Sequence, residues 1–322
     1  MKARIRLLGV LIFLIVVAGI SCALIAAGRD GDILSESVIT EEEIPDAGLF
    51  GSKARTILEQ VEVKRITYLS DGLGVNGYLA IPKNGTHLPC VIYNRGGNRE
   101  FGSLTDLSAV TRLGQYASWG YIVLASQYRG NAGGEGREEF GGADVNDVLN
   151  LIPVLESLPQ ADASRIGMIG SSRGGMMTYI ALTRTDRIDA AVVMAGLADS
   201  FDAVSRRPEM ENVYAALVPN WKEEREAALE ARSAVYWPER LYKETPILLL
   251  HGSADWRVHP TQALQMASAL FAASHPFRFV FFEGGDHGLT EYQEEVDRLV
   301  KDWLDYYVRD GQTWPSLEPH GR

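Results

Sequence analysis

Apolar runs separated by mixed polar stretches recur along the chain from residue 61 onward, and their lengths predict a succession of strands and helices. Residues 61–69 and 75–81 predict two strands joined by a turn at Asp71-Gly72. The clearest helix lies near the end of the chain, where Val296, Val300 and Trp303 fall on one face. Further strands are predicted at residues 89–93, 121–126, 166–169, 190–195, 247–250 and 277–282.

This succession predicts the fold class. An antiparallel start followed by repeated strand–helix units favours an α/β protein, with a mostly parallel central sheet and helices on both faces. Residues 200–243 lack a strand pattern and predict a helical insertion that contains Tyr214, Trp221, Tyr236 and Trp237. Such an insertion would lie above the carboxyl ends of the strands, where ligands bind in this architecture. The alternative is a helical connector whose aromatic side chains pack into the core.

The N-terminal residues indicate export. Lys2, Arg4 and Arg6 precede an uncharged run over residues 7–27, which is long enough to span a bilayer. Residues 1–28 therefore predict either a cleaved signal peptide or a retained signal-anchor transmembrane segment. The rest of the chain would lie outside the cytoplasm, secreted or periplasmic in the first case and membrane-anchored in the second. Residues 29–54 are polar and acidic and predict a linker, residues 55–310 the folded domain, and residues 311–322 a tail.

Composition and charge exclude several classes of function. The 322-residue chain is 46% hydrophobic and 23% charged, as expected for a globular core. A net charge of −11 argues against a nucleic-acid partner. Only two cysteines are present, Cys22 and Cys90, so neither a disulfide framework nor a cysteine-based zinc site is expected.

The most informative motif is Gly170-Ser171-Ser172-Arg173-Gly174, which lies between a predicted strand and a predicted helix. This is the G-x-S-x-G nucleophile elbow of the α/β-hydrolase fold in its required context. The sharp turn leaves little room for Cβ atoms beside the serine, which explains the flanking glycines. Ser172, at the tip of the elbow, is the candidate nucleophile.

A serine nucleophile needs a general base that is oriented by a carboxylate, and in this fold the order along the chain is serine, acid, histidine. Asp255 follows the predicted strand at residues 247–250, and His287 follows the strand at residues 277–282. We predict that His287 is the base and Asp255 the acid. His251, close behind its strand, is predicted to be a hydrogen-bonded structural residue, and Asp286 a supporting residue beside the base.

The tetrahedral intermediate of acyl transfer also needs two hydrogen-bond donors for its oxyanion. The backbone N–H of Arg173 follows the nucleophile directly, and the backbone N–H of Gly97 is the candidate from the loop after the third predicted strand. This chemistry needs no cofactor and no metal, and none is expected.

Residues 91–289 resemble the catalytic domain of the prolyl oligopeptidase family of serine hydrolases. The resemblance rests on Tyr128-Arg129-Gly130, on the segment from Phe140 to Val145, and on the acid-loop region, which comprises Arg232-Ser233-Ala234, His251-Gly252, Asp255, Val258 and Gln262. Arg173 stands where the family usually has tyrosine, and Asn94-Arg95-Gly96-Gly97 where members often have His-Gly-Gly. The residues before the core leave no room for the large N-terminal β-propeller of many members.

The resemblance implies acyl-enzyme chemistry and leaves the substrate open. We expect an exported serine peptidase of prolyl oligopeptidase type that acts on small peptide or aminoacyl substrates. The alternative is a carboxylesterase acting on small acyl esters. A more remote alternative is a non-catalytic binding protein, although such proteins typically lose a triad member. The expected partners are a small molecule or short peptide, together with the membrane if the N-terminal segment is retained.

Overall fold

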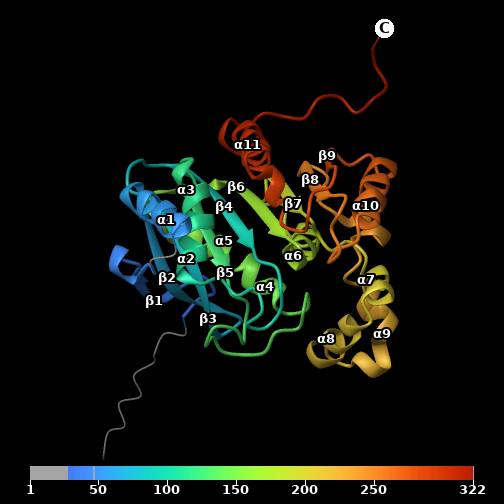
Figure 1. Ribbon diagram of the computed structural model, residues 1–322, viewed down its shortest axis with the longest axis horizontal. Coiled ribbons are helices and arrows are strands. Elements are labelled where there is room, and N and C mark those ends of the chain that lie inside the picture. The colour runs from blue at the N-terminus through green and yellow to red at the C-terminus, as the bar shows by residue number, and fades with distance from the viewer. Residues whose placement is uncertain (1–27, 46–47, 322) are drawn as a thin grey trace, which may run out of the picture.

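The computed structural model describes residues 28–45 and 48–321, which form a nine-stranded sheet flanked by helices (Figure 1). The sheet order is β1-β2-β3-β5-β4-β6-β7-β8-β9. The strands from β1 to β5 in this order pair antiparallel, and those from β5 to β9 pair parallel. The strands are β1 (Ile33–Val38), β2 (Val61–Ser70), β3 (Leu73–Pro82), β4 (Leu88–Asn94), β5 (Ile122–Ser126), β6 (Ala161–Ser171), β7 (Ala190–Met194), β8 (Ile247–Gly252) and β9 (Phe277–Phe282).

Helices connect the strands, and every predicted strand is present within a few residues of its expected bounds. The helices are α1 (Leu49–Gln60), α2 (Asp106–Ser108), α3 (Gly114–Ser118), α4 (Val145–Leu149), α5 (Leu151–Ser157), α6 (Arg173–Leu182), α7 (Ser200–Arg206), α8 (Glu209–Leu217), α9 (Trp221–Glu230), α10 (Thr261–Ala272) and α11 (Gln293–Leu304). Short helical turns are η1 (Glu41–Glu43), η2 (Ala109–Leu113), η3 (Ala234–Tyr236), η4 (Pro238–Arg240), η5 (Thr290–Tyr292) and η6 (Asp305–Arg309).

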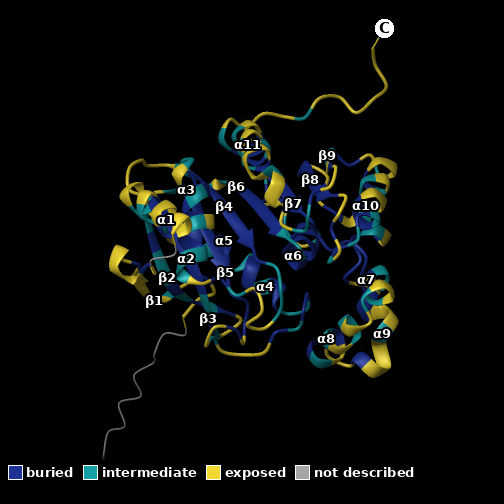
Figure 2. Cartoon of the chain, in the orientation of Figure 1, coloured by how far each residue is buried: buried dark blue, intermediate teal, exposed yellow. Residues whose placement is uncertain are grey.

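The core has two halves, one on each face of the sheet. In β4, Cys90 and Ile92 pack into one half with α4, α5, α6 and α10, whereas Val91 and Tyr93 pack into the other with α1, α3 and α11. A parallel strand that is covered on both faces has apolar residues at successive positions, which is why the central strands were visible in the sequence. Figure 2 shows these strands buried between more exposed helices.

The segment predicted as an acidic linker differs from expectation. Residues 33–38 form β1, which pairs antiparallel with β2, and Ile39 and Ile44 are buried. α1 begins at Leu49, so the folded domain starts before residue 55. β1 is an edge strand with mostly exposed side chains, so its polar sequence resembled a linker while its backbone completes the sheet.

The predicted signal or anchor segment lies almost entirely in residues 1–27, outside the described residues. Within residues 28–45 and 48–321, no helix is long and apolar enough to cross a bilayer.

Residues 200–243 are helical, as predicted, and consist of α7, α8, α9, η3 and η4. Three of the four aromatic residues pack into the core: Tyr214, Trp221 and Trp237 are buried, and the rings of Tyr214 and Trp221 stack 5.3 Å apart. Tyr236 is exposed. Tyr214, Trp221 and Trp237 therefore follow the core-packing alternative, whereas Tyr236 does not.

Candidate active site

Ser172 lies at a strained point of the backbone between β6 and α6. Its φ and ψ angles are +57° and −123°, a conformation that residues with a side chain rarely adopt. The turn is fixed by hydrogen bonds: the Ser172 N–H donates to the Met194 carbonyl at 2.9 Å, and the Leu197 N–H donates to the Ser172 carbonyl at 3.0 Å. Strain maintained by the surrounding structure is characteristic of functional sites. Ser172, and not Ser171, is the residue at the tip of the elbow.

The two glycines of the motif are required by contacts. A Cβ atom on Gly170 would lie 2.3 Å from the Gly174 carbonyl oxygen. A Cβ atom on Gly174 would lie 1.9 Å from the carbonyl oxygen of Asn94, at the end of β4. The backbone of the elbow thus lies in close contact both with its own next turn and with the end of β4, which explains why small residues flank the serine.

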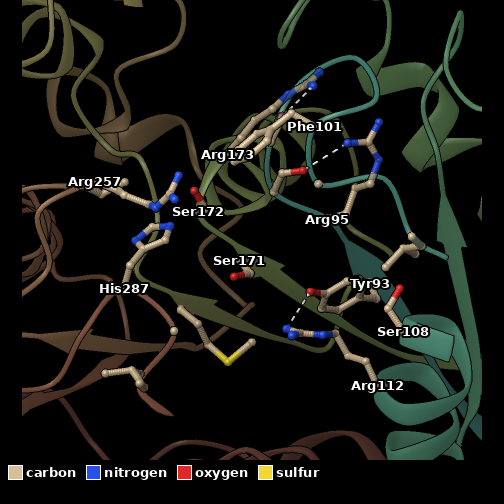
Figure 3. A pocket seen from close by; sticks show the side chains of 18 of the residues that line it. Tyr93, Arg95, Phe101, Ser108, Arg112, Ser171, Ser172, Arg173, Arg257 and His287 are labelled. Atoms are coloured by element: carbon tan, nitrogen blue, oxygen red, sulfur yellow. Dashed lines mark hydrogen bonds between the residues drawn. The ribbon is translucent and has the colours of Figure 1, made fainter. Parts of the chain in front are cut away.

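The structure brings Asp255 and His287 together from the ends of β8 and β9. His287 Nδ1 lies 2.8 Å from Asp255 Oδ2, and the other carboxylate oxygen accepts the N–H groups of Arg257 and Val258 at 2.8 and 3.0 Å. With Nδ1 held by the carboxylate, Nε2 of the imidazole is the nitrogen left for another partner. His287 and Ser172 line the same cavity, and Figure 3 shows their side chains on neighbouring parts of its wall.

Asp255 is buried and is contacted by a second histidine. Burial raises the pKa of its carboxyl group, but hydrogen bonds from His251 and His287 outweigh burial and hold the pKa well below its usual range. His251 Nε2 lies 2.9 Å from the Val258 carbonyl oxygen and 3.2 Å from Asp255 Oδ2. As predicted, His251 is a buried, hydrogen-bonded residue, and its additional contact with Asp255 was not foreseen.

Asp286 shapes the loop that carries His287. Its carboxylate accepts the Gly288 N–H at 2.8 Å and the Thr290 hydroxyl at 2.6 Å. The Thr290 hydroxyl is the main cause of the lowered pKa of Asp286. Among the described residues no hydrogen bond joins Asp286 to the His287 ring, in keeping with the supporting role predicted for it.

The loop after β4 packs directly on the elbow. A Cβ atom on Gly96 would lie 3.0 Å from the Ser172 Cβ and 3.1 Å from the Ser171 carbonyl oxygen. Gly97 follows with a φ of +74°, and both glycines line the cavity with Ser172 and Arg173. The Arg173 N–H is in the first position of α6, where it has no acceptor within its own helix. The predicted oxyanion donors therefore border the serine, and Gly96 is a contact that sequence reasoning missed.

The Arg173 side chain forms a buried network that was also missed. Its guanidinium makes ion pairs with Glu138 and Asp144, the second at 2.6 Å, and donates to the Gly97 carbonyl at 3.1 Å. It also lies over the rings of Tyr128 and Phe140, 4.6 Å from each ring centroid. The residue that replaces the usual tyrosine thus ties the elbow to the loop after β4 and to the segment before α4.

A cavity of about 710 Å³ opens over Ser172 and His287 (Figure 3). The helical insertion contributes Ala203, Arg207 and Met210 to its wall, whereas Trp221 is not among the lining residues. The expected position of the insertion beside the ligand site is therefore correct in outline. Trp221 itself is buried against Tyr214 and takes no part in the wall of the cavity.

Comparison with known proteins identifies the family. The model of the prolyl oligopeptidase family matches residues 108–311, more than half of the chain. The chain belongs to the prolyl oligopeptidase family. It is 30% identical over 248 residues to the uncharacterized peptidase YtmA of Bacillus subtilis, a match that covers 76% of this chain and 94% of that protein. The chain spans 38% or less of the length of the other curated relatives compared with it.

Solved structures agree in fold. Pyrococcus horikoshii acylaminoacyl peptidase is 22% identical, with a TM-score of 0.67, and the match covers 80% of this chain and 44% of that one. The acetyl xylan esterase from Paenibacillus sp. R4 is 18% identical, with a TM-score of 0.61, over 84% of this chain and 88% of that one. The protein is thus a serine hydrolase of the prolyl oligopeptidase family with an α/β-hydrolase fold.

Proposed function

We propose that the protein is a serine peptidase that cleaves small peptide or aminoacyl substrates through an acyl-enzyme. The observation that supports this proposal is the 2.8 Å hydrogen bond between His287 and Asp255, beside a cavity that His287 and the strained Ser172 both line. Ser172 would attack the substrate carbonyl while His287 Nε2 takes the hydroxyl proton. His287 would then give that proton to the leaving group as the bond to it breaks. Water, deprotonated by His287, would next attack the acyl-enzyme, and the proton would pass to the Ser172 oxygen as the acid is released.

Two further parts of the site have roles in this mechanism. Asp255 would hold His287 in the required tautomer and stabilise the imidazolium that forms, because its carboxylate is buried and stays ionised. The backbone N–H groups of Arg173 and Gly97 would stabilise the oxyanion. The chain itself supplies each of these groups.

The alternative activity is hydrolysis of small acyl esters. A cavity of about 710 Å³ suits small substrates of either kind, and one fold relative is an acetyl xylan esterase. Family membership favours the peptidase. The two activities are separated by the ratio of kcat/KM for an amide and an ester that share one acyl group.

The nucleophile is tested by labelling with a fluorophosphonate, which reacts with activated serines. Ser172→Ala should abolish labelling and turnover while the protein stays folded. Ser171→Ala is the matched control, since it removes a neighbouring hydroxyl that is not at the tip of the elbow, and it should keep substantial activity. Labelling that survives Ser172→Ala and disappears with Ser171→Ala would overturn the assignment.

We also propose that the catalytic domain is exported. The support is the basic start of the chain and the uncharged run over residues 7–27. A reporter that is active only outside the cytoplasm should be active when fused to the C-terminus, and inactive when residues 1–28 are deleted from the same fusion. Activity of a cytoplasm-dependent reporter alone would contradict the proposed topology.

A further inference from the structure

The wall of the cavity is cationic although the protein is acidic. The chain carries a net charge of −11, yet Asp297 is the only carboxylate residue among the described residues that line the cavity. A recess lined by charges of one sign concentrates the electric field and attracts ligands of the opposite sign. Besides His287, the lysine and arginine residues that line the same cavity are Lys53, Arg95, Arg112, Arg173, Arg207 and Arg257.

Arg112 differs from the paired cations of this wall. Arg173 and Arg207 form ion pairs with protein carboxylates, whereas Arg112 forms none within the described part of the chain. Its Nη1 donates to the Tyr93 hydroxyl at 3.1 Å, and its guanidinium lies 5.8 Å from the centre of that ring. A guanidinium has five N–H donors, so this contact orients the group and leaves most donors available.

Arg112 lies at the end of the cavity that residues following His287 also line, since the charge of Asp297 acts on Arg112. In Figure 3, Tyr93 and Arg112 lie on one side of Ser171, whereas Phe101 and Arg173 lie on the other. The lining residues Leu289, Gln293 and Asp297 come from the chain that directly follows His287, the group that protonates the leaving atom. Apolar lining residues, including Leu197, Ala203 and Met210, come instead from the segments after β7.

Asp297 offsets this positive charge only in part, because one carboxylate faces two cations. Its side chain accepts a hydrogen bond from Gln293 at 3.2 Å, and no ion pair between it and Arg112 is found among the described residues. Burial is the main cause of the raised pKa of Asp297, opposed by the Gln293 hydrogen bond and by the charges of Lys53 and Arg112. This end of the cavity thus holds two cations, Lys53 and Arg112, against one carboxylate.

We propose that Arg112 binds a carboxylate on the leaving group of the substrate, held in place by the Tyr93 hydroxyl. The planar guanidinium suits two parallel hydrogen bonds to a carboxylate. The preferred substrates are then small molecules whose leaving group is anionic, as is the C-terminal amino acid of a short peptide with a free carboxylate. This inference rests on the proposed function, because it assumes that Ser172 and His287 act as nucleophile and general acid.

The test compares leaving groups that differ only in charge. The probes are the acetyl esters of 3- and 4-hydroxybenzoate and of the corresponding hydroxybenzamides, with kcat/KM normalised to the uncatalysed hydrolysis rate of each ester. The wild-type protein should favour the carboxylate by roughly tenfold to a hundredfold in at least one isomer, the range of a charge-assisted hydrogen bond. Arg112→Gln should bring this ratio close to one, and Arg112→Lys should give an intermediate value.

The matched control is Arg298→Gln, which removes the same charge from the exposed face of α11 and should leave the ratio unchanged. A wild-type ratio near one for both isomers, or a preference that persists in Arg112→Gln, would overturn the inference. Fluorophosphonate labelling is measured on every variant. Failure of the wild-type protein to label would contradict the proposed function, whereas normal labelling with no charge preference contradicts only the role of Arg112.

Discussion

The buried network around Arg173 predicts a large effect of a single substitution. Arg173→Met keeps most of the side-chain volume but leaves Glu138 and Asp144 without their cation, and both carboxylates are almost fully buried. Removing one partner of a buried ion pair typically costs about 3–5 kcal/mol. Glu138 still accepts the Arg99 N–H at 2.7 Å, and Asp144 the Gly141 N–H at 2.9 Å. Because these hydrogen bonds remain, we expect the lower end of that 3–5 kcal/mol range, a loss of about 3 kcal/mol in the free energy of unfolding.

The assay is urea unfolding followed by fluorescence, in which a change of midpoint at constant slope reports stability. The set comprises Arg173→Met, Glu138→Gln and the double variant. Because the two side chains are in contact, the double variant should lose about 1–3 kcal/mol less than the sum of the single variants. Arg173→Met should also slow fluorophosphonate labelling, since the guanidinium holds the Gly97 carbonyl. A loss below about 1 kcal/mol, or strict additivity, would refute the network as a stabilising unit.

Three other changes test separate parts of the site. Asp255→Asn should lower kcat by about 10⁴-fold, as in other serine triads. The pKa of Asp255 is lower in the folded protein than in the unfolded chain, so the ionised carboxylate stabilises the fold above about pH 4 and this stabilisation is lost as the pH falls further. The difference in unfolding free energy between wild type and Asp255→Asn should therefore shrink in acid, as measured by urea unfolding from pH 3 to 7. Trp221→Ala should destabilise the fold by about 3–5 kcal/mol, whereas Met210→Ala should chiefly change KM; the reverse pattern in unfolding and kinetic measurements would contradict the assignment of these two residues. Gly96→Ala should reduce labelling at least tenfold in a folded protein, because its Cβ would contact Ser172; unaltered labelling kinetics would show that the loop can shift freely.

The sequence predicted those strands and helices whose buried faces produce a regular pattern of hydrophobic residues. The central strands are covered on both faces, and the loops that carry Ser172, Asp255 and His287 follow them directly, so fold class and chain order indicated these residues together. β1 was missed because an edge strand with exposed side chains has no such pattern. Its pairing uses the backbone, which hydropathy does not report.

The sequence also could not predict contacts between side chains that lie far apart along the chain. The sequence assigned Arg173 a role for its N–H group alone, because Glu138 and Asp144 lie 35 and 29 residues away in an irregular segment. Nothing in the local sequence distinguishes a buried, paired arginine from a solvated one. The same is true of Arg112, because its hydrogen bond to the Tyr93 hydroxyl depends on how η2 packs against β4.

The position of β9 at the end of the sheet has a consequence for how activity is lost. Within the part of the chain that the structure describes, β9 pairs only with β8, and most of its side chains are not fully buried. The loop after β9 carries His287. Edge elements open locally at a lower free energy than the centre of a domain. Opening of β9 would move His287 away from Asp255 while β4, β6 and β7 remain paired. On gradual heating, turnover should therefore disappear reversibly at a lower temperature than the far-ultraviolet signal of the central sheet.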